Sequence, residues 1–235
     1  MIAITHENIT AIRNEIAAAC QKAGRQVQEV RLVAVSKFVP VEKILTVYNM
    51  GQKAFGENRV QDLLKKRLLL PLDIEWHLIG TLQRNKVKDI VGLVSVIHSV
   101  DSILLAREIS RCAVKKNVTV TVLLQVNIAK EAAKHGFLKD DLFNSIFEIA
   151  GLPGINVRGL MTIAPLVPDP ESIRDVFSDL KLLAQQIDAL RLESITMEEL
   201  SMGMSDDFHV AIEEGATLVR IGSRIFGPRY NQEGV

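Results

Sequence analysis

Cysteines, aromatic residues and an excess of charge of either sign are all scarce in this sequence. The two cysteines, Cys20 and Cys112, have no CxxC spacing and no neighbouring histidine cluster, which argues against a disulfide framework or a zinc site. Aromatic residues make up 5% of the chain, too few for a base-stacking platform. The 28 basic residues balance the 28 acidic residues, so we expect no nucleic-acid or membrane partner. The thiols should be reduced and half-buried.

Long apolar runs are missing as well. The N-terminal stretch from Met1 to Asn8 has no basic region followed by an apolar segment, as a secretory signal would. No segment has the length that crossing a membrane requires, so we expect a cytoplasmic protein. Hydrophobic residues make up 48% of the 235 residues, which is enough for one sizeable core, and we predict a single domain over residues 1–235.

Short apolar runs alternate with helix-like segments along the whole chain. After a leading helix over about residues 5–24, eight strands are predicted, each followed by a helix or the start of one. Asp101 and Ser205 are predicted helix caps. Eight such units favour a (β/α)8 TIM barrel with an extra N-terminal helix. The predicted strands cover residues 32–37, 54–58, 74–80, 94–100, 118–126, 157–161, 200–203 and 218–222.

The alternative fold is a doubly wound open sheet with a dinucleotide site. That fold would place a Gly-x-Gly-x-x-Gly turn after an early strand. The first strand is followed instead by Ser36-Lys37-Phe38-Val39-Pro40, so we prefer the barrel.

In such a barrel the functional site lies at the carboxyl ends of the strands. Lys37 ends the first buried strand there. When this strand is considered alone, the preferred interpretation is a surface lysine whose amine reaches solvent. The strand ends hold neither a pair of carboxylates suited to glycoside hydrolysis nor a ligand set for a catalytic metal. The polar and neighbouring residues at the other strand ends are Asn58, His77, Gly80, Asn127, Met161, Thr162, Ser201, Gly203, Arg220, Gly222 and Ser223.

Two neighbouring clusters at this rim are typical of anion sites. They cover residues 200–205 and 220–223 and combine glycines with serine hydroxyls. Each cluster alone also fits turn and cap residues, but two together, after the last two strands, favour phosphate. Arg220 shares a strand face with Gly222 and should point inward, toward a core carboxylate or a ligand ring. A lysine opposite a phosphate site fits a phosphorylated aldehyde bound as a Schiff base.

Other candidates keep two readings. His77 is either a hydrogen-bonded core histidine or a ligand contact. Asn58 and Asn127 either contact a ligand or satisfy loop backbone.

Taken together, the motifs of the chain closely resemble the pyridoxal phosphate homeostasis protein family, known in bacteria as the YggS family, which looks like the barrel domain of alanine racemase standing alone. Its specific motifs follow one another over nearly the whole chain. They are Ala34-Val35-Ser36-Lys37, Phe55-Gly56-Glu57-Asn58, Trp76-His77-Leu78-Ile79-Gly80-Thr81-Leu82-Gln83-Arg84-Asn85-Lys86, Gly159-Leu160-Met161, Leu200-Ser201-Met202-Gly203-Met204-Ser205-Asp206-Asp207 and Val219-Arg220-Ile221-Gly222-Ser223-Arg224-Ile225-Phe226-Gly227.

The resemblance implies a bound pyridoxal 5'-phosphate (PLP), held by Lys37 through a Schiff base. It implies that Arg220 faces the pyridine nitrogen, which makes the ring a weaker electron sink. The family pattern leads us to expect a smaller or polar residue where this chain has Phe38. Ser201, Gly222 and Ser223, with the Met202 and Gly203 amides, would hold the phosphate, and Asn58, His77 and Met161 would line the pocket.

The resemblance also bears on activity. Racemases of this fold carry a second domain that supplies a tyrosine base, and we expect no such domain here; the two tyrosines are Tyr48 and Tyr230. Racemisation needs a group on each face of the substrate carbon, and Lys37 alone is evident. We therefore expect a PLP carrier or regulator, not an enzyme, with PLP-dependent apo-enzymes as candidate partners and a monomer as the default state. The alternatives are a weak amino-acid racemase and a cofactor-independent Schiff-base aldolase.

Overall fold

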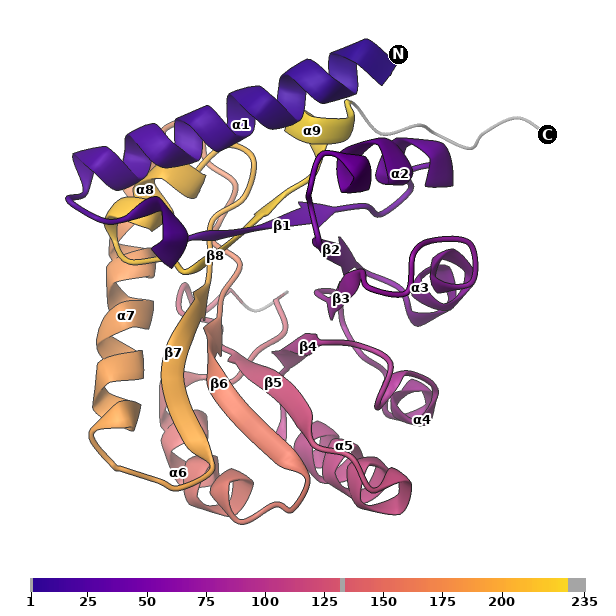
Figure 1. Cartoon of the computed structure of the whole chain (residues 1–235). Coiled ribbons are helices and arrows are strands. Elements are labelled where there is room, and N and C mark those ends of the chain that lie inside the picture. The colour runs from indigo at the N-terminus through magenta and orange to yellow at the C-terminus, as the bar shows by residue number, and fades with distance from the viewer. Residues whose placement is uncertain (1, 132–133, 228–235) are drawn as a thin grey trace.

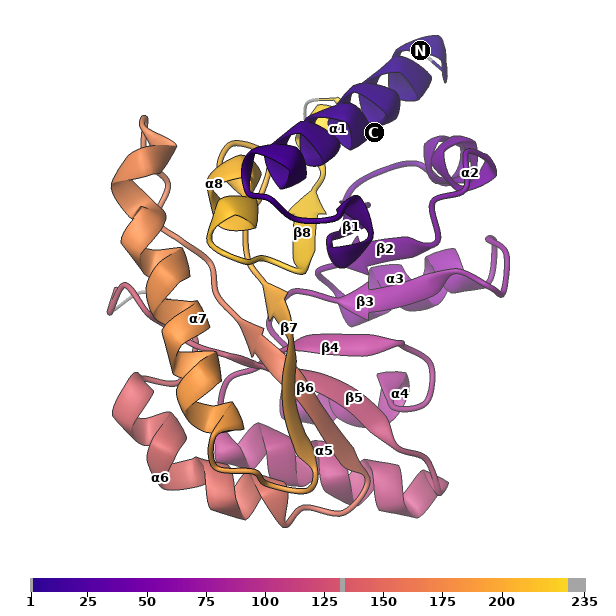
Figure 2. The same cartoon turned by 60° about the vertical axis from the view of Figure 1, so that its left-hand side comes forward.

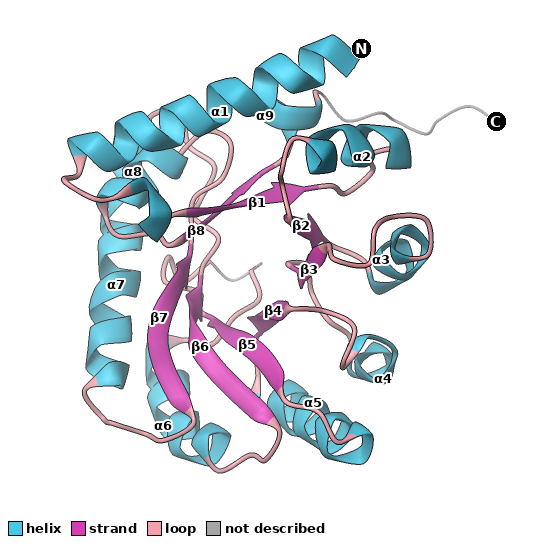
Figure 3. Ribbon diagram, viewed as in Figure 1, coloured by secondary structure: helices cyan, strands magenta, loops and turns pink. Residues whose placement is uncertain are grey.

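Eight parallel strands form a closed barrel, in chain order, with β8 returning to pair with β1. The computed structural model describes residues 2–131 and 134–227, and the barrel confirms the predicted fold (Figures 1 and 3). The strands are Arg31–Val35 (β1), Ala54–Glu57 (β2), Glu75–Leu78 (β3), Val96–Val100 (β4), Val120–Gln125 (β5), Ile155–Met161 (β6), Ile195–Ser201 (β7) and Leu218–Ile221 (β8).

Helices surround the barrel, and the N-terminal helix α1 lies across one side of it, packed against α2, α8 and α9 (Figures 1 and 2). Three short 3-10 turns, η1 to η3, complete the elements of the described residues. The helices and turns are Ile2–Lys22 (α1), Val27–Glu29 (η1), Val41–Asn49 (α2), Val60–Arg67 (α3), Arg84–Lys86 (η2), Val87–Ile90 (α4), Ile103–Lys116 (α5), Lys139–Ala150 (α6), Pro170–Ile173 (η3), Arg174–Asp188 (α7), Phe208–Glu213 (α8) and Ser223–Phe226 (α9).

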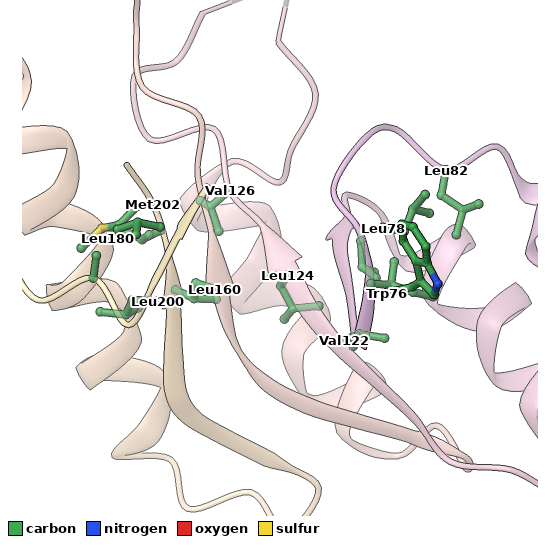
Figure 4. Packing of buried hydrophobic residues seen from close by; sticks show 14 of the residues in the cluster. Trp76, Leu78, Leu82, Val122, Leu124, Val126, Leu160, Leu180, Leu200 and Met202 are labelled. Carbon is green, nitrogen blue, oxygen red and sulfur yellow. The ribbon is translucent and has the colours of Figure 1, made fainter. Parts of the chain in front are cut away.

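Alternation of side chains along each strand divides the core into two layers. Val33, Leu123 and Met161 belong to a small cluster contributed by six different strands. Residues of the opposite parity join the helices in a much larger outer layer. In Figure 4, Trp76 lies beside Leu78 in this outer layer. Burial on both faces explains why the strands read as continuous apolar runs.

Several predicted boundaries were wrong. Strand β1 ends at Val35, two residues before Lys37, because a turn begins at Ser36. Ser102, not Asp101, caps α5, since its hydroxyl accepts the Leu105 amide. Strand β7 begins at Ile195, earlier than predicted, because its first half is not fully buried and lacks an apolar run.

Two further expectations are corrected. The residue that precedes α8 is Asp207, not Ser205, so Ser205 stays in the loop before the helix. Cys20 and Cys112 are fully buried rather than half-buried, and both are free thiols. In the described part of the chain, no helix is both long enough and apolar enough to cross a membrane.

Candidate ligand-binding site

A cavity of about 290 Å³ opens at the carboxyl ends of the strands, and we call it the rim cavity. Its volume is close to the lower end of the range for small-ligand sites, roughly 300 Å³. Segments that follow β1, β2, β3, β6, β7 and β8 all contribute to it. Its lining residues are Val35, Lys37, Phe38, Val39, Pro40, Lys43, Asn58, Ile79, Ile163, Met204, Ser205, Asp206, Arg220, Gly222, Ser223, Phe226 and Gly227.

Lys37 enters the rim cavity from a tight turn over residues 36–39. The Val39 amide donates to the Ser36 carbonyl oxygen at 2.9 Å and closes this turn. Lys37 and Phe38 are its two central residues, and Phe38 has a φ of 61°. Left-handed backbone is unusual for a bulky residue and marks a position that its surroundings must enforce. Phe38 is 51% exposed and lines the cavity, and the centre of its ring lies 5.8 Å from the Arg59 guanidinium.

Arg220 reaches the cavity from β8 and is buried. Its guanidinium donates to the Ser201 hydroxyl at 2.5 Å and to the Thr162 carbonyl oxygen at 2.9 Å. Burial lowers the pKa of Arg220 to about 10, so the side chain stays protonated at neutral pH. Within residues 2–131 and 134–227, no ion pair joins it to a carboxylate. Its positive charge therefore remains available to a ligand.

A chain of buried polar side chains extends from Arg220 across the barrel interior. The Ser201 hydroxyl lies 2.8 Å from His98 Nδ1, and His98 Nε2 lies 2.8 Å from His77 Nδ1. At the far end, His77 Nε2 has no hydrogen-bond partner among the described residues. Burial lowers the pKa of His77 to about 3, and burial together with the charge of Arg220 lowers that of His98. Both histidines are therefore neutral at pH 7 and act as hydrogen-bonding core residues.

Two serine hydroxyls meet where the loops after β7 and β8 approach each other. Ser205 Oγ and Ser223 Oγ are 3.2 Å apart, and both residues line the rim cavity. The Asp207 carboxylate accepts the Met204 amide at 2.5 Å and so shapes the loop that carries Ser205. Gly222 packs against Val35 of β1, where a Cβ would come within 3.1 Å of the Val35 carbonyl oxygen.

Five of the ten predicted site residues line the cavity: Lys37, Asn58, Arg220, Gly222 and Ser223. The other five lie outside the lining, each for a visible reason. Ser201 and His77 belong to the buried polar chain, and Met161 is part of the inner core cluster. The Met202 amide donates to the Leu218 carbonyl oxygen, and Gly203 packs tightly under Phe208 and Ala211.

Ser205 lines the rim cavity and Ser201 does not, and the apolar wall of the cavity was not predicted from the sequence. Ser205 belongs to the cluster over residues 200–205 that is typical of an anion site, and a helix cap was the alternative interpretation of this residue. Asn127 satisfies loop backbone, the second of its two predicted roles, because its side chain forms hydrogen bonds with the backbone of Glu131 and Lys134. Nothing in the sequence distinguished Ile79 or Ile163, which line the cavity, from other buried apolar residues.

The cavity brings together an amine, a guanidinium and two hydroxyls in a small, partly apolar space. These groups suit a ligand with a carbonyl group, an acceptor atom and an anionic group. The Tyr48 hydroxyl donates to Asp73 at 2.6 Å on an exposed surface, outside the lining, and Tyr230 lies outside the described residues. Across those same residues, no group of three or more His, Cys, Asp or Glu side chains is arranged to hold a metal ion.

Comparison with known proteins gives the same fold and names a family. Residues 8–230 match the family model described as "Alanine racemase, N-terminal domain". The pyridoxal phosphate homeostasis protein of Aquifex aeolicus is 46% identical over 225 residues, which cover 95% of this chain and 97% of that protein.

Solved structures are similar over nearly the whole barrel. PipY of Synechococcus elongatus PCC7942, solved without PLP, superposes with a TM-score of 0.85 at 34% identity and covers 95% of this chain and all of that one. The same protein with PLP bound superposes with a TM-score of 0.79 at 36% identity, covering 90% of this chain and 100% of that one. Alanine racemase of Clostridium difficile 630 shares the fold at 15% identity and a TM-score of 0.76, with 99% of this chain matching 58% of that one.

Proposed function

Since the chain belongs to the pyridoxal phosphate homeostasis proteins, which are built on the alanine racemase N-terminal domain, we propose that it binds PLP covalently through Lys37. We further propose that it acts as a carrier or regulator of this cofactor and has no dedicated catalytic activity. The relative with PLP in its solved structure supports the choice of ligand. The single observation that carries the proposal is the meeting of Lys37, Arg220 and the two serines in one cavity.

The donor set of the rim cavity fits PLP group by group. Lys37 is the amine for the aldehyde: a Schiff base forms when the neutral amine adds to the carbonyl carbon and water leaves. Ser205 and Ser223 supply hydroxyl donors for the phosphate, next to Gly222. In our proposal Ser205 replaces Ser201 as a phosphate contact, because the Ser201 hydroxyl is already bonded to Arg220.

Arg220 is the residue that limits the chemistry. When bound, PLP supplies an electrophilic aldehyde and a ring that withdraws electrons from it. A protonated guanidinium that faces the ring nitrogen disfavours a second positive charge there, so the ring withdraws fewer electrons. Arg220 is held by two hydrogen bonds, to a hydroxyl and a carbonyl, and both leave it charged. This arrangement favours storage of the cofactor over turnover of amino acids.

The visible spectrum of the purified protein tests the proposal. We expect added PLP to give a yellow protein whose chromophore is lost on borohydride reduction, with the reduced adduct at Lys37 in peptide maps. Peptide mapping is needed because Lys43 also lines the cavity. Lys37→Ala should give no adduct, while Lys65→Ala, on the exposed face of α3, should behave as wild type.

Other outcomes would decide against the proposal. A wild-type protein that stays colourless with PLP overturns it. Interconversion of alanine enantiomers that is lost in Lys37→Ala would instead establish a racemase. Borohydride trapping that requires a sugar phosphate, with no cofactor present, would establish an aldolase.

A further inference from the structure

A buried ion pair lies directly behind the turn that carries Lys37. Glu57 ends β2 and is fully buried, and its Oε1 accepts from Lys66 Nζ of α3 at 2.6 Å. Only 12% of the Lys66 side chain is exposed. Removing two charges from water is costly, and a buried pair is weak evidence of stability by itself. The pair therefore calls for another explanation.

Both charged groups also bind Ser36, the residue before Lys37. Lys66 Nζ donates to the Ser36 carbonyl oxygen at 2.7 Å, and the Ser36 hydroxyl donates to Glu57 Oε1 at 2.7 Å. The Ser36 amide donates to the Gly56 carbonyl oxygen at 2.9 Å. Every polar group of Ser36 is thus held, and three elements, β1, β2 and α3, converge on it.

The same carbonyl oxygen of Ser36 closes the 36–39 turn by accepting the Val39 amide. Lys66 therefore fixes the first residue of the turn, and Lys37 is the second. The third residue, Phe38, holds a left-handed φ of 61°, which an aromatic residue adopts only when its surroundings impose it. The ion pair contacts the first residue of this turn, and neither Glu57 nor Lys66 lines the rim cavity.

We propose that Glu57 and Lys66 are positioning residues that lock the 36–39 turn and so aim the Lys37 amine into the rim cavity. The inference rests on the proposed attachment of PLP to Lys37. It assigns a role to Glu57, which the ligand-binding proposal leaves unused. Asp62 of α3 is the other charged group whose field acts on Glu57. It raises the pKa of the Glu57 carboxyl, as burial does more strongly.

The first experiment needs no ligand. Amide hydrogen exchange at Val39 should be about fivefold to tenfold faster in Lys66→Met than in wild type, the factor that corresponds to one hydrogen bond. Lys66→Arg keeps a cation within reach of the same acceptors and should restore part of the protection. Lys65→Met, on the exposed side of α3, is the matched control and should leave exchange at Val39 unchanged.

The second experiment separates positioning from general support of the cavity. In Lys66→Met and Glu57→Gln, we expect the rate of imine formation with PLP to fall about tenfold, again the scale of one hydrogen bond. Affinity for 4'-deoxypyridoxine 5'-phosphate, which has the ring and phosphate but no aldehyde, should stay within about twofold of wild type, since these residues lie outside the lining. A loss that is equal for both ligands indicates a structural role only and overturns the inference.

Failure of the two proposals can be told apart. If wild type forms no adduct with PLP, the proposed function fails, while the exchange at Val39 still reports on the lock. If wild type forms the adduct and both variants match it in rate and exchange, the positioning role is wrong. Should Lys66→Met not fold, the doubly neutral variant Glu57→Gln/Lys66→Gln leaves no unpaired buried charge and is measured in the same way.

Discussion

At the scale of single residues, two serines that lie four positions apart, Ser201 at the end of β7 and Ser205 in the loop that follows, have different partners. Ser201 is fully buried and bonds Arg220 and His98, whereas Ser205 lines the rim cavity beside Ser223. Both read alike in the sequence, as hydroxyls within a motif typical of anion sites. Their partners show that Ser201 supports Arg220 and that Ser205 faces the ligand space.

This difference predicts a phosphate-selective loss of binding for one alanine variant and a non-selective loss for the other. Ser205→Ala should weaken PLP binding by about tenfold to a hundredfold, because a hydrogen bond to a charged group contributes roughly 1.5–3 kcal/mol. It should leave the binding of pyridoxal, which has no phosphate, almost unchanged. Ser201→Ala should weaken the binding of both PLP and pyridoxal, because the Arg220 guanidinium loses a hydrogen-bond acceptor. Equilibrium titrations of each variant with both ligands provide the measurement, and a phosphate-selective loss in Ser201→Ala would contradict the assignment.

At the scale of elements, the connection from β7 to α8 is packed without spare room. Gly203 has a φ of +86°, and a Cβ there would come within 2.6 Å of the Ala211 Cβ and 2.9 Å of the Phe208 Cα. The next two residues, Met204 and Ser205, line the cavity. The glycine therefore lets α8 approach the barrel closely while the chain turns toward the ligand space.

A comparison of two glycines separates backbone conformation from packing. Gly24, after α1, has a φ of +66° and open space around its Cβ position, so Gly24→Ala should cost about 1–2 kcal/mol, for the backbone alone. Gly203→Ala adds a steric overlap of about 1–3 kcal/mol and should cost more in total. Urea unfolding of the two variants measures the difference. Equal losses of unfolding free energy in the two variants would show that α8 shifts away from the added methyl group at residue 203 without a cost.

At the scale of the whole molecule, the neutral histidines inside the barrel make stability depend on pH. The unfolded pKa of His77 is near 6.5, and burial lowers the folded value to about 3. The unfolded chain therefore binds more protons between these values, and the free energy of unfolding falls as pH falls through that window. Each such histidine contributes a slope of about 1.4 kcal/mol per pH unit. Burial raises the pKa of Glu57. This carboxyl therefore has the opposite effect: it lowers the free energy of unfolding as pH rises above the pKa that it has in the unfolded chain.

We expect His77→Gln to flatten this dependence between pH 6.5 and pH 4 by about 1 kcal/mol per pH unit. His209→Gln, at an exposed position, should keep the slope of wild type. Chemical denaturation at a series of pH values measures both. A slope that His77→Gln leaves unchanged would mean that the barrel opens to solvent before it unfolds.

Local patterns of the sequence predict the fold of this protein and the positions of two residues of its candidate site. Eight apolar runs separated by helix-like segments predict the closed barrel, because burial on both faces of a parallel strand requires such runs. The same order places Lys37 and Arg220 at strand ends that line the rim cavity. Side-chain parity within β8 correctly predicts that Arg220 points inward.

The tertiary structure alone decided which polar groups meet. The His77–His98–Ser201 chain joins β3, β4 and β7, and the Glu57–Lys66 pair joins β2 and α3. Hydrogen bonds of this kind depend on distances between residues far apart in the chain, which no local period encodes. The sequence by itself determined that a lysine lies at the rim of a barrel, because the local pattern of strands and helices fixes that position. Only the fold decided that a buried ion pair stands behind the turn that presents it.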